Sequence, residues 1–152
     1  MNSAAPLFSQ SDVLLDVELL NKQALFEAVG SLWEKRYGIA ANEVVKSLKA
    51  REELGSTGLG QGVAIPHARI KGLTEAVAAF ARPRKPIEFD SPDGQPVTYC
   101  FVLLVPVEAT EQHLQILAQV AEMLSNEQFR NQLGSAKSEA EIHQIFAAWR
   151  GA

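Results

Sequence analysis

Residues 51–69 read REELGSTGLGQGVAIPHAR, and the rest of the chain is interpreted around this stretch. It holds four of the ten glycines, Gly58 and Gly60 among them, and then enters a short apolar run that ends on Pro66 and His67. A loop rich in glycine lets backbone N–H groups approach a ligand without obstruction by side chains. Proline restricts its own φ angle, so the backbone directly before the histidine is stiff. The stretch therefore predicts a loop that presents His67 as a nucleophile toward phosphorus.

The glycines lie between a predicted helix and a predicted strand. The helix is expected from about Asn42 to Gly55, which places Arg51 in its last turn. There Arg51 can compensate the partial negative charge at the helix C-terminus, or it can hold a phosphate, and the spacing does not decide between these roles. Residues 63–66 after the glycines are short and β-like.

Further strands and a helix are expected on either side. Residues 13–17 indicate a short strand or an extended segment, and a helix follows with Asn21 as its N-cap and Gly38 past its end. Residues 76–81 fit a strand or a helix by composition, and the absence of helix caps favours a strand. Residues 97–105 are rich in β-branched and aromatic side chains with almost no polar alternation, which is typical of a central strand buried on both faces.

The C-terminal third predicts three helices. Thr110 caps the first, residues 127–133 form a short second one that Gly134 ends, and Ser138 opens the last with a capping box. The apolar face expected on the first helix consists of Leu114, Leu117, Ala118, Ala121 and Leu124. Helices before and after a block of strands predict an α/β fold with a mixed sheet flanked by helices on both faces.

Length and composition indicate one globular domain. The chain has 152 residues, 47% of them apolar and 21% charged, with a net charge of −4. We expect a flexible leader over residues 1–10 and a single domain over residues 11–152.

The apolar run 99–107 is too short to cross a bilayer, and no stretch is dominated by basic residues, so a nucleic-acid partner is not expected. The only cysteine, Cys100, excludes an internal disulfide, and a cytoplasmic location is the default expectation.

Several chemistries that use glycines or histidines do not fit the sequence. The Gly-Lys-Ser/Thr of a Walker loop and the Gly-x-Ser-x-Gly of a hydrolase are absent, and the glycines follow a helix rather than a strand. A zinc site could use His67 and His113, but no third ligand has suitable spacing. Phosphoryl transfer needs mainly positioning and charge stabilisation, so it remains. His113 follows the central strand at the start of a helix, where it is either a site residue or an ordinary polar one.

The pattern over residues 51–67, RExxGSTGLGxGVAIPH, resembles the active-site motif of enzyme IIA proteins of the fructose/mannitol class in the bacterial phosphoenolpyruvate-dependent phosphotransferase system. The downstream motifs PIxFD at 86–90, DGxPV at 93–97, FxLLVP at 101–106 and HLxxLA at 113–118 match as well. The resemblance covers roughly residues 12–148. Because no carrier or permease module is fused to it, the chain looks most like the nitrogen-regulatory branch, enzyme IIA-Ntr.

The resemblance implies roles for particular residues. His67 would accept the phosphoryl group on Nε2 from a phosphohistidine carrier of the HPr type, with Arg51 beside the phosphoryl oxygens and His113 as a second histidine near the site. No cofactor and no metal are implied. The residues expected to bind phosphate or to position His67 are Ser56, Thr57, Gly58 and Gly60. Arg69, two positions after His67, is a further cation that is expected to contact the phosphate or the carrier.

Two outputs are open at this point. The nitrogen branch implies a regulator related to nitrogen and potassium, whose unphosphorylated surface docks on targets such as sensor kinases or potassium transporters. The alternative is a sugar-specific enzyme IIA that passes its phosphate to an enzyme IIB for sugar uptake. The basic cluster of Arg82, Arg84 and Lys85 departs from the family pattern and is expected to affect the choice of partner rather than the chemistry.

Overall fold

The structure, a computed structural model, describes residues 4–108 and 110–150. The described residues form one mixed sheet in the order β1-β5-β6-β3-β2, and β4 also pairs with β6. Strand β1 pairs with β5 in parallel, and β5 pairs with β6 antiparallel, so the sheet is mixed. The strands are β1 (Val13–Val17), β2 (Gly58–Gly60), β3 (Val63–Ala64), β4 (His67–Ile70), β5 (Val77–Pro83) and β6 (Tyr99–Pro106).

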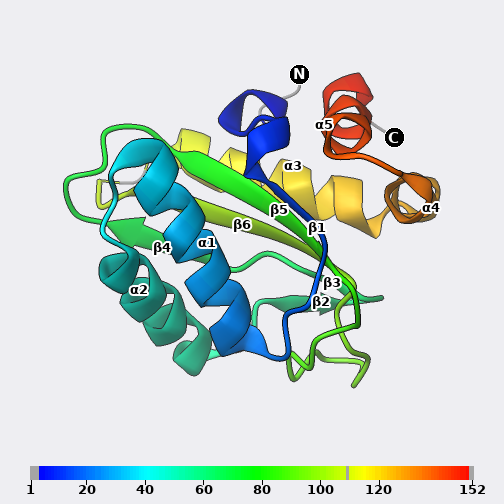
Figure 1. Ribbon diagram of the computed structural model, residues 1–152, viewed down its shortest axis with the longest axis horizontal. Helices are drawn as coiled ribbons and strands as arrows, with labels where there is room; N and C mark the ends of the chain where they lie inside the picture. The colour runs from blue at the N-terminus through cyan, green and yellow to red at the C-terminus, as the bar shows by residue number, and fades with distance from the viewer. Residues whose placement is uncertain (1–3, 109, 151–152) are drawn as a thin grey trace.

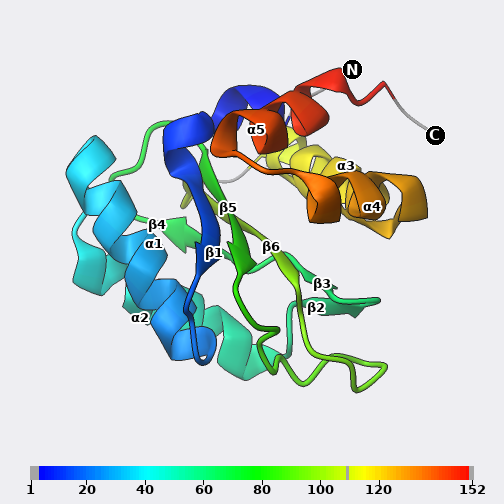
Figure 2. The same ribbon diagram turned by 45° about the vertical axis from the view of Figure 1, so that its right-hand side comes forward.

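Helices cover both faces of the sheet (Figures 1 and 2). One face carries α1 (Lys22–Tyr37) and α2 (Ala41–Leu54), whose apolar side chains share a core with the sheet. The opposite face carries α3 (Glu111–Ser125), α4 (Glu127–Ser135) and α5 (Glu139–Ala148) over a second core. The expected mixed sheet with helices on both faces is confirmed.

Strand β6 is the centre of the sheet, as the run of apolar residues predicts. Residues 100–105 are buried, and Cys100 among them packs as a small apolar side chain. Strands β3 and β4 both run parallel to β6 on the same side, with Val63 opposite Tyr99 and His67 opposite Leu103. They are two halves of one strand that is interrupted between Ala64 and His67. The interruption leaves His67 at the start of the second half, beside the middle of the central strand.

Local signals at helix ends are confirmed for the first helix. The Asn21 side chain accepts a hydrogen bond from the Ala24 N–H at 2.8 Å, which satisfies one of the free donors at the helix start. Gly38 adopts a left-handed conformation with φ 71° past the helix end. At the start of α5, the Ser138 hydroxyl accepts a hydrogen bond from the Glu141 N–H at 3.2 Å. The Glu141 carboxylate accepts from the Lys137 N–H and not from the Ser138 N–H, so the predicted capping box is only half formed.

Residues 4–10 of the expected leader pack against the rest of the domain. Residues 5–7 and 10–12 form short 3₁₀ helices. Ala4 is fully buried, and the Phe8 ring packs edge-on against Phe101 and Phe146. This segment buries apolar surface that the C-terminal helices leave uncovered, because removing apolar surface from water is favourable. Residues 1–3 of the predicted leader lie outside the described residues.

The predicted apolar face of α3 is wrong in part. The residues that enter the core are Ile116, Val120, Met123 and Leu124. Leu114 is 63% exposed and Ala118 is exposed as well. The helix has apolar residues at helical spacing on two neighbouring faces, so periodicity alone does not show which of them meets the sheet.

Helix α4 extends to Ser135, beyond the stop predicted at Gly134. Gly134 is a packing position instead, because a Cβ there would lie 2.6 Å from the Tyr99 hydroxyl oxygen. Arg82 on β5 closes this helix end: its Nη1 donates to the Leu133 and Ala136 carbonyls, both at 2.8 Å. Its Nη2 also pairs with the Asp16 carboxylate at 2.9 Å. Arg82 therefore has a structural role, and it does not form a free basic patch with Arg84.

We expect Arg82→Met to destabilise the fold by about 2 kcal/mol, because it leaves helix carbonyls without a donor in a region where Arg82 is only 12% exposed. Urea unfolding followed by circular dichroism measures this change. Arg84→Met is the matched control, since the Arg84 side chain is exposed, and it should stay within about 0.5 kcal/mol of the parent. Equal stability of the two variants would contradict the role of Arg82.

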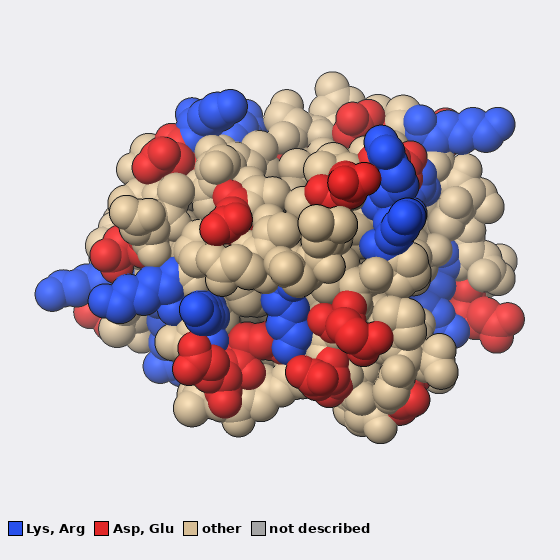
Figure 3. Space-filling model, turned by 60° about the horizontal axis from the view of Figure 1, so that its bottom comes forward, with Lys and Arg blue, Asp and Glu red and all other residues tan. Residues whose placement is uncertain are grey.

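The surface charge is mixed. Figure 3 shows lysine and arginine side chains interspersed with aspartate and glutamate over one face, in line with the small net charge of −4. Within residues 4–108 and 110–150, no helix has both the length and the apolar character needed to cross a membrane.

Candidate active site

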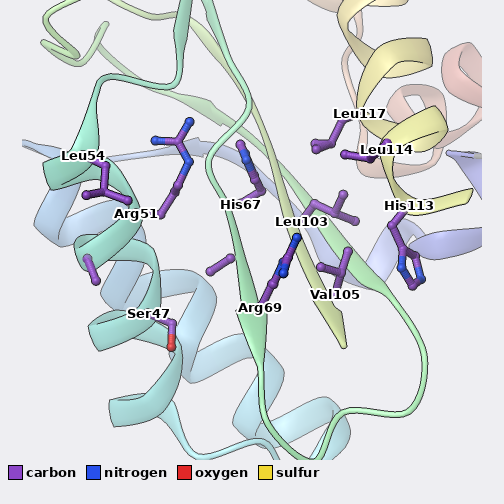
Figure 4. A pocket seen from close by; sticks show the side chains of 12 residues that line it. Ser47, Arg51, Leu54, His67, Arg69, Leu103, Val105, His113, Leu114 and Leu117 are labelled. Carbon is purple, nitrogen blue, oxygen red and sulfur yellow. The ribbon is translucent and has the colours of Figure 1, made fainter. Parts of the chain in front are cut away.

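A pocket of about 490 Å³ opens where the C-terminal half of α2, strands β4 and β6 and the N-terminal half of α3 meet (Figure 4). It gathers residues that are up to seventy positions apart in the sequence, His67 among them. The lining residues are Ser47, Ala50, Arg51, Leu54, His67, Ala68, Arg69, Leu103, Val105, His113, Leu114 and Leu117.

The half-buried imidazole of His67 is held by its own backbone. Its Nδ1 lies 2.8 Å from the carbonyl oxygen of Ile65, two residues earlier. Since a carbonyl oxygen only accepts hydrogen bonds, Nδ1 must carry the proton. In the neutral ring, the lone pair is then on Nε2. The geometry thus selects the tautomer whose free nitrogen can act as a nucleophile.

The pKa of His67 lies below its ordinary value. Burial is the main cause, because a desolvated imidazole resists protonation, and the positive charge of Arg51 acts in the same direction. The hydrogen bond to Ile65 and the negative charge of Glu52 oppose this shift only partly. His67 is therefore neutral near pH 7, with its Nε2 lone pair available.

We expect an NMR titration of His67 to give a midpoint below the ordinary value of about 6.5. Because the folded pKa is lower than the unfolded pKa, the unfolded chain binds more protons between the two values, so this group's contribution to stability is lost as the pH falls below about 6.5. Arg51→Met should move the midpoint upward, because a neighbouring positive charge is removed. A midpoint at or above the ordinary value in the parent protein would contradict the burial argument.

Arg51 combines the two roles that the sequence left open. It lies in the last turn of α2, and its Nη1 donates to the carbonyl of Gly55 at 2.9 Å, which closes the helix end. Its guanidinium also lines the pocket, and Figure 4 shows it beside the imidazole of His67. A guanidinium has five N–H donors, so the bond to Gly55 leaves others available to an anion.

Arg69 supplies a second cation to this pocket. It is exposed and lies two residues after His67 on β4, so both side chains leave the strand on the same face. Figure 4 shows Arg69 below His67 along the strand. The pocket thus contains two arginines, Arg51 and Arg69, together with His67.

His113 lines the same pocket but is not paired with His67. It is the third residue of α3, and its Nδ1 accepts a hydrogen bond from the Thr110 N–H at 3.0 Å. Its Nε2 therefore carries the proton in the neutral ring. In Figure 4 its ring lies beyond Val105 and is turned away from His67. The expected second histidine is close to the site, in a capping role that sequence reasoning missed.

The glycines predicted to cradle a phosphate lie outside this pocket. Gly58 and Gly60 belong to β2, which pairs with β3, and the Gly58 N–H bonds to the Ser56 hydroxyl at 3.0 Å. A Cβ at Gly58 would lie 2.3 Å from the Ser91 hydroxyl oxygen, so glycine is needed there for close packing. Gly60 has φ 89°, a conformation that favours glycine, next to Asp93. These glycines serve the sheet edge.

Ser56 and Thr57 also have partners within the fold. The Ser56 hydroxyl donates to the carbonyl of Phe89. The Thr57 hydroxyl and its N–H both donate to the carboxylate of Glu52. Neither residue lines the pocket. Of the two expected roles, phosphate binding and positioning of His67, the geometry therefore favours positioning.

Sequence reasoning missed the apolar part of the pocket. Leu54 is 85% exposed and Leu114 is 63% exposed, and both lie at the pocket with the half-buried Leu117. Exposed leucines close to a reactive histidine are typical of a surface that another protein covers. One signal was present in the sequence: α3 has a second apolar face, with Ile116 and Val120, beside the face of Leu114 and Leu117. Only one of the two faces can be fully buried against the sheet.

The described residues contain no group of three or more His, Cys, Asp or Glu side chains that is arranged to hold a metal ion. The pocket offers cations and one free imidazole nitrogen, which suit an anionic ligand.

The chain matches a known protein family over almost its whole length. Residues 6–149 match the family described as the phosphoenolpyruvate-dependent sugar phosphotransferase system, EIIA 2. The chain belongs to this family. It is thus an EIIA-type phosphocarrier component of a phosphotransferase system, and the resemblance to the fructose/mannitol class is confirmed.

The nitrogen-regulatory branch of this EIIA family contains similar proteins. The nitrogen regulatory protein of Pseudomonas aeruginosa is 40% identical over 133 residues, which are 87% of this chain and 86% of that protein. The crystal structure of nitrogen regulatory protein IIA-Ntr from Neisseria meningitidis is 44% identical, with a TM-score of 0.89 over 93% of this chain and 97% of that one. IIA mannitol from Escherichia coli, at 17% identity and a TM-score of 0.76 over 91% and 98% of the two chains, has the same fold.

Proposed function

We propose that this EIIA protein works as a single enzyme IIA domain that accepts a phosphoryl group on Nε2 of His67 from a phosphohistidine carrier of the HPr type. The observation that carries the proposal is the 2.8 Å contact between His67 Nδ1 and the Ile65 carbonyl, which leaves Nε2 as the free nitrogen at the pocket. Its phosphorylation state is the regulatory output, in nitrogen- and potassium-related control.

The transfer can be written as one substitution at phosphorus. The Nε2 lone pair of His67 forms the new N–P bond, the N–P bond to the carrier's histidine breaks, and its electron pair returns to the carrier's ring nitrogen. His67 keeps its Nδ1 proton, so its ring becomes cationic, and the Ile65 carbonyl stabilises this charge through a charge-assisted hydrogen bond. Arg51 and Arg69 face the phosphoryl oxygens, where fixed cations stabilise the transition state.

The surface around His67 supports docking of the carrier and of regulated proteins. Leu54 and Leu114 supply exposed apolar area beside the nucleophile. The phosphoryl group itself carries about 1.5 to 2 negative charges, of which the cationic imidazole ring offsets one, so the middle of this surface becomes negative. Binding of an apolar partner surface then becomes unfavourable, so sensor kinases or potassium transporters could distinguish the two states. Relatives named nitrogen regulatory proteins at 36–40% identity support this output.

The alternative output is transfer to a sugar-specific enzyme IIB. A related fold, enzyme IIA-Mtl of Escherichia coli, is known in complex with phosphorylated enzyme IIB-Mtl, at 16% identity to this chain. Phosphorylated protein incubated with purified enzyme IIB of the fructose and mannitol types separates the two outputs. Retention of the phosphate supports the regulatory function, and rapid transfer to an enzyme IIB supports the transport function.

The deciding test is intact-mass spectrometry after incubation with phosphoenolpyruvate, enzyme I and an HPr-type carrier, at alkaline pH to preserve the N–P bond. We expect one added phosphate on the parent protein. His113→Ala should be phosphorylated more slowly but completely, because its ring lines the pocket without pairing with His67. No added phosphate with a working donor control would overturn the proposal.

A further inference from the structure

We propose that Glu52 is the positioning residue of this site: its buried carboxylate holds Thr57, and through Thr57 and Ile65 it fixes the orientation and tautomer of His67. The inference rests on the proposed function, because it concerns how the phosphate-accepting imidazole is prepared. Three hydrogen-bonded steps connect the carboxylate to the ring.

The first step is a double contact between Glu52 and Thr57. Oε1 of Glu52 accepts from the Thr57 hydroxyl at 2.6 Å, and Oε2 accepts from the Thr57 N–H at 3.0 Å. Both partners are shielded from water: the Glu52 side chain is 7% exposed and Thr57 is 5% exposed. A carboxylate that accepts two bonds from one residue fixes both the position and the direction of that residue's backbone.

The next two steps run along the backbone. The carbonyl of Thr57 accepts from the Ile65 N–H at 3.1 Å, and the carbonyl of Ile65 is the partner of His67 Nδ1 at 2.8 Å. The N–H and the carbonyl of Ile65 belong to the two peptide groups on either side of its Cα, so the two bonds hold adjacent peptide groups of the chain. A displacement of Thr57 therefore shifts the peptide whose oxygen selects the protonated nitrogen of His67.

The place of Glu52 in its helix supports a dedicated role. It lies in the last turn of α2, where the helix dipole disfavours a negative charge. Lys22 compensates this charge from α1, with its Nζ 2.9 Å from Oε2 and 5.0 Å from the centre of the Phe89 ring. Lys22 also lies 3.9 Å from the Asp90 carboxylate. A desolvated carboxylate at an unfavourable helix end is costly even with a cation beside it, which supports a role for its bonds to Thr57.

The other elements at His67 do not replace this anchor. Arg51 bonds to Gly55 and Arg69 is exposed on β4. His113 is held by Thr110. Among the described charged groups at the pocket and next to His67, Glu52 is the one carboxylate joined to the imidazole by a continuous series of hydrogen bonds.

The test compares Glu52→Gln with Glu53→Gln, which removes a neighbouring exposed carboxylate from the same helix turn. A glutamine can accept only one of the two bonds from Thr57, since its amide nitrogen is a donor. Two readouts are measured: the tautomer of His67 from its ¹⁵N ring shifts, and the phosphorylation rate with the HPr-type carrier. Outer-shell partners of metal-bound histidines contribute roughly 10- to 100-fold, and we expect a loss of that order for Glu52→Gln only.

A second pair of variants keeps the test valid if Glu52→Gln does not fold. Thr57→Val removes the hydroxyl but keeps the shape, and Thr57→Ser restores the hydroxyl. In Thr57→Val we expect the ¹⁵N ring shifts of His67 to show a mixture of the Nδ1–H and Nε2–H tautomers. In Thr57→Ser we expect the tautomer of the parent protein.

The outcomes separate the two proposals. A folded Glu52→Gln or Thr57→Val protein with the parent tautomer and the parent rate would overturn the role of Glu52. A parent protein that holds the Nδ1–H tautomer but takes no phosphate at His67 would overturn the proposed function, and the tautomer measurements on the variants would still decide the role of Glu52.

Discussion

Replacement of His67 by alanine is expected to abolish phosphorylation by the HPr-type carrier. The described pocket offers no other imidazole nitrogen in the same position, because His113 lies beyond Val105 with its Nδ1 bonded to Thr110. The substitution removes a half-buried ring at the start of β4 and should leave the fold intact. Intact-mass spectrometry at alkaline pH then shows only the unmodified mass, while the parent protein gains one phosphate.

His143→Ala is the matched control for the nucleophile. This histidine lies on α5, and its Nε2 contacts the Ala5 carbonyl at 3.0 Å, away from the pocket. It should be phosphorylated at the parent rate. If His67→Ala still gained a phosphate, or if His143→Ala lost it, the assignment of the nucleophile would be incorrect.

The second large effect is expected at Arg51. Arg51→Met should slow phosphorylation by roughly 10²- to 10³-fold, the loss typical for one fixed donor that stabilises charge in a transition state. The hydrogen bond from Arg51 to Gly55 is lost as well, which should lower stability by no more than about 1 kcal/mol. Single-turnover phosphorylation with a fixed carrier concentration measures the rate, and urea unfolding measures stability separately.

Lys49→Met controls for the loss of one positive charge on the same helix. Lys49 is exposed, and it does not line the pocket. We expect its phosphorylation rate to stay within about twofold of the parent, because exposed charges at such positions are screened by salt. Equal rates for Arg51→Met and the parent protein would show that this arginine only closes the helix end.

Some of the residues that line the pocket could be predicted from the sequence, whereas the surroundings of the glycines could not. The motif led directly to His67 and to Arg51 in the last helix turn, and both line the pocket. The same motif suggested that Gly58 and Gly60 face a phosphate, and their backbone is instead used in pairing and packing at β2. Glycines in a motif indicate a close approach of backbone to something, and the sequence does not say whether that neighbour is a ligand or another loop.

Features that depend on nearby residues were determined by the sequence alone. The cap of α1 at Asn21, its end at Gly38 and the burial of β6 follow from bonds and periodicities within a few positions. Only the tertiary structure decided which face of α3 enters the core, that residues 4–10 cover the sheet, and that Glu52 is connected to His67. These features depend on which distant surfaces become neighbours, because packing and burial of apolar area, rather than local preference, select among faces that the chain leaves equally possible.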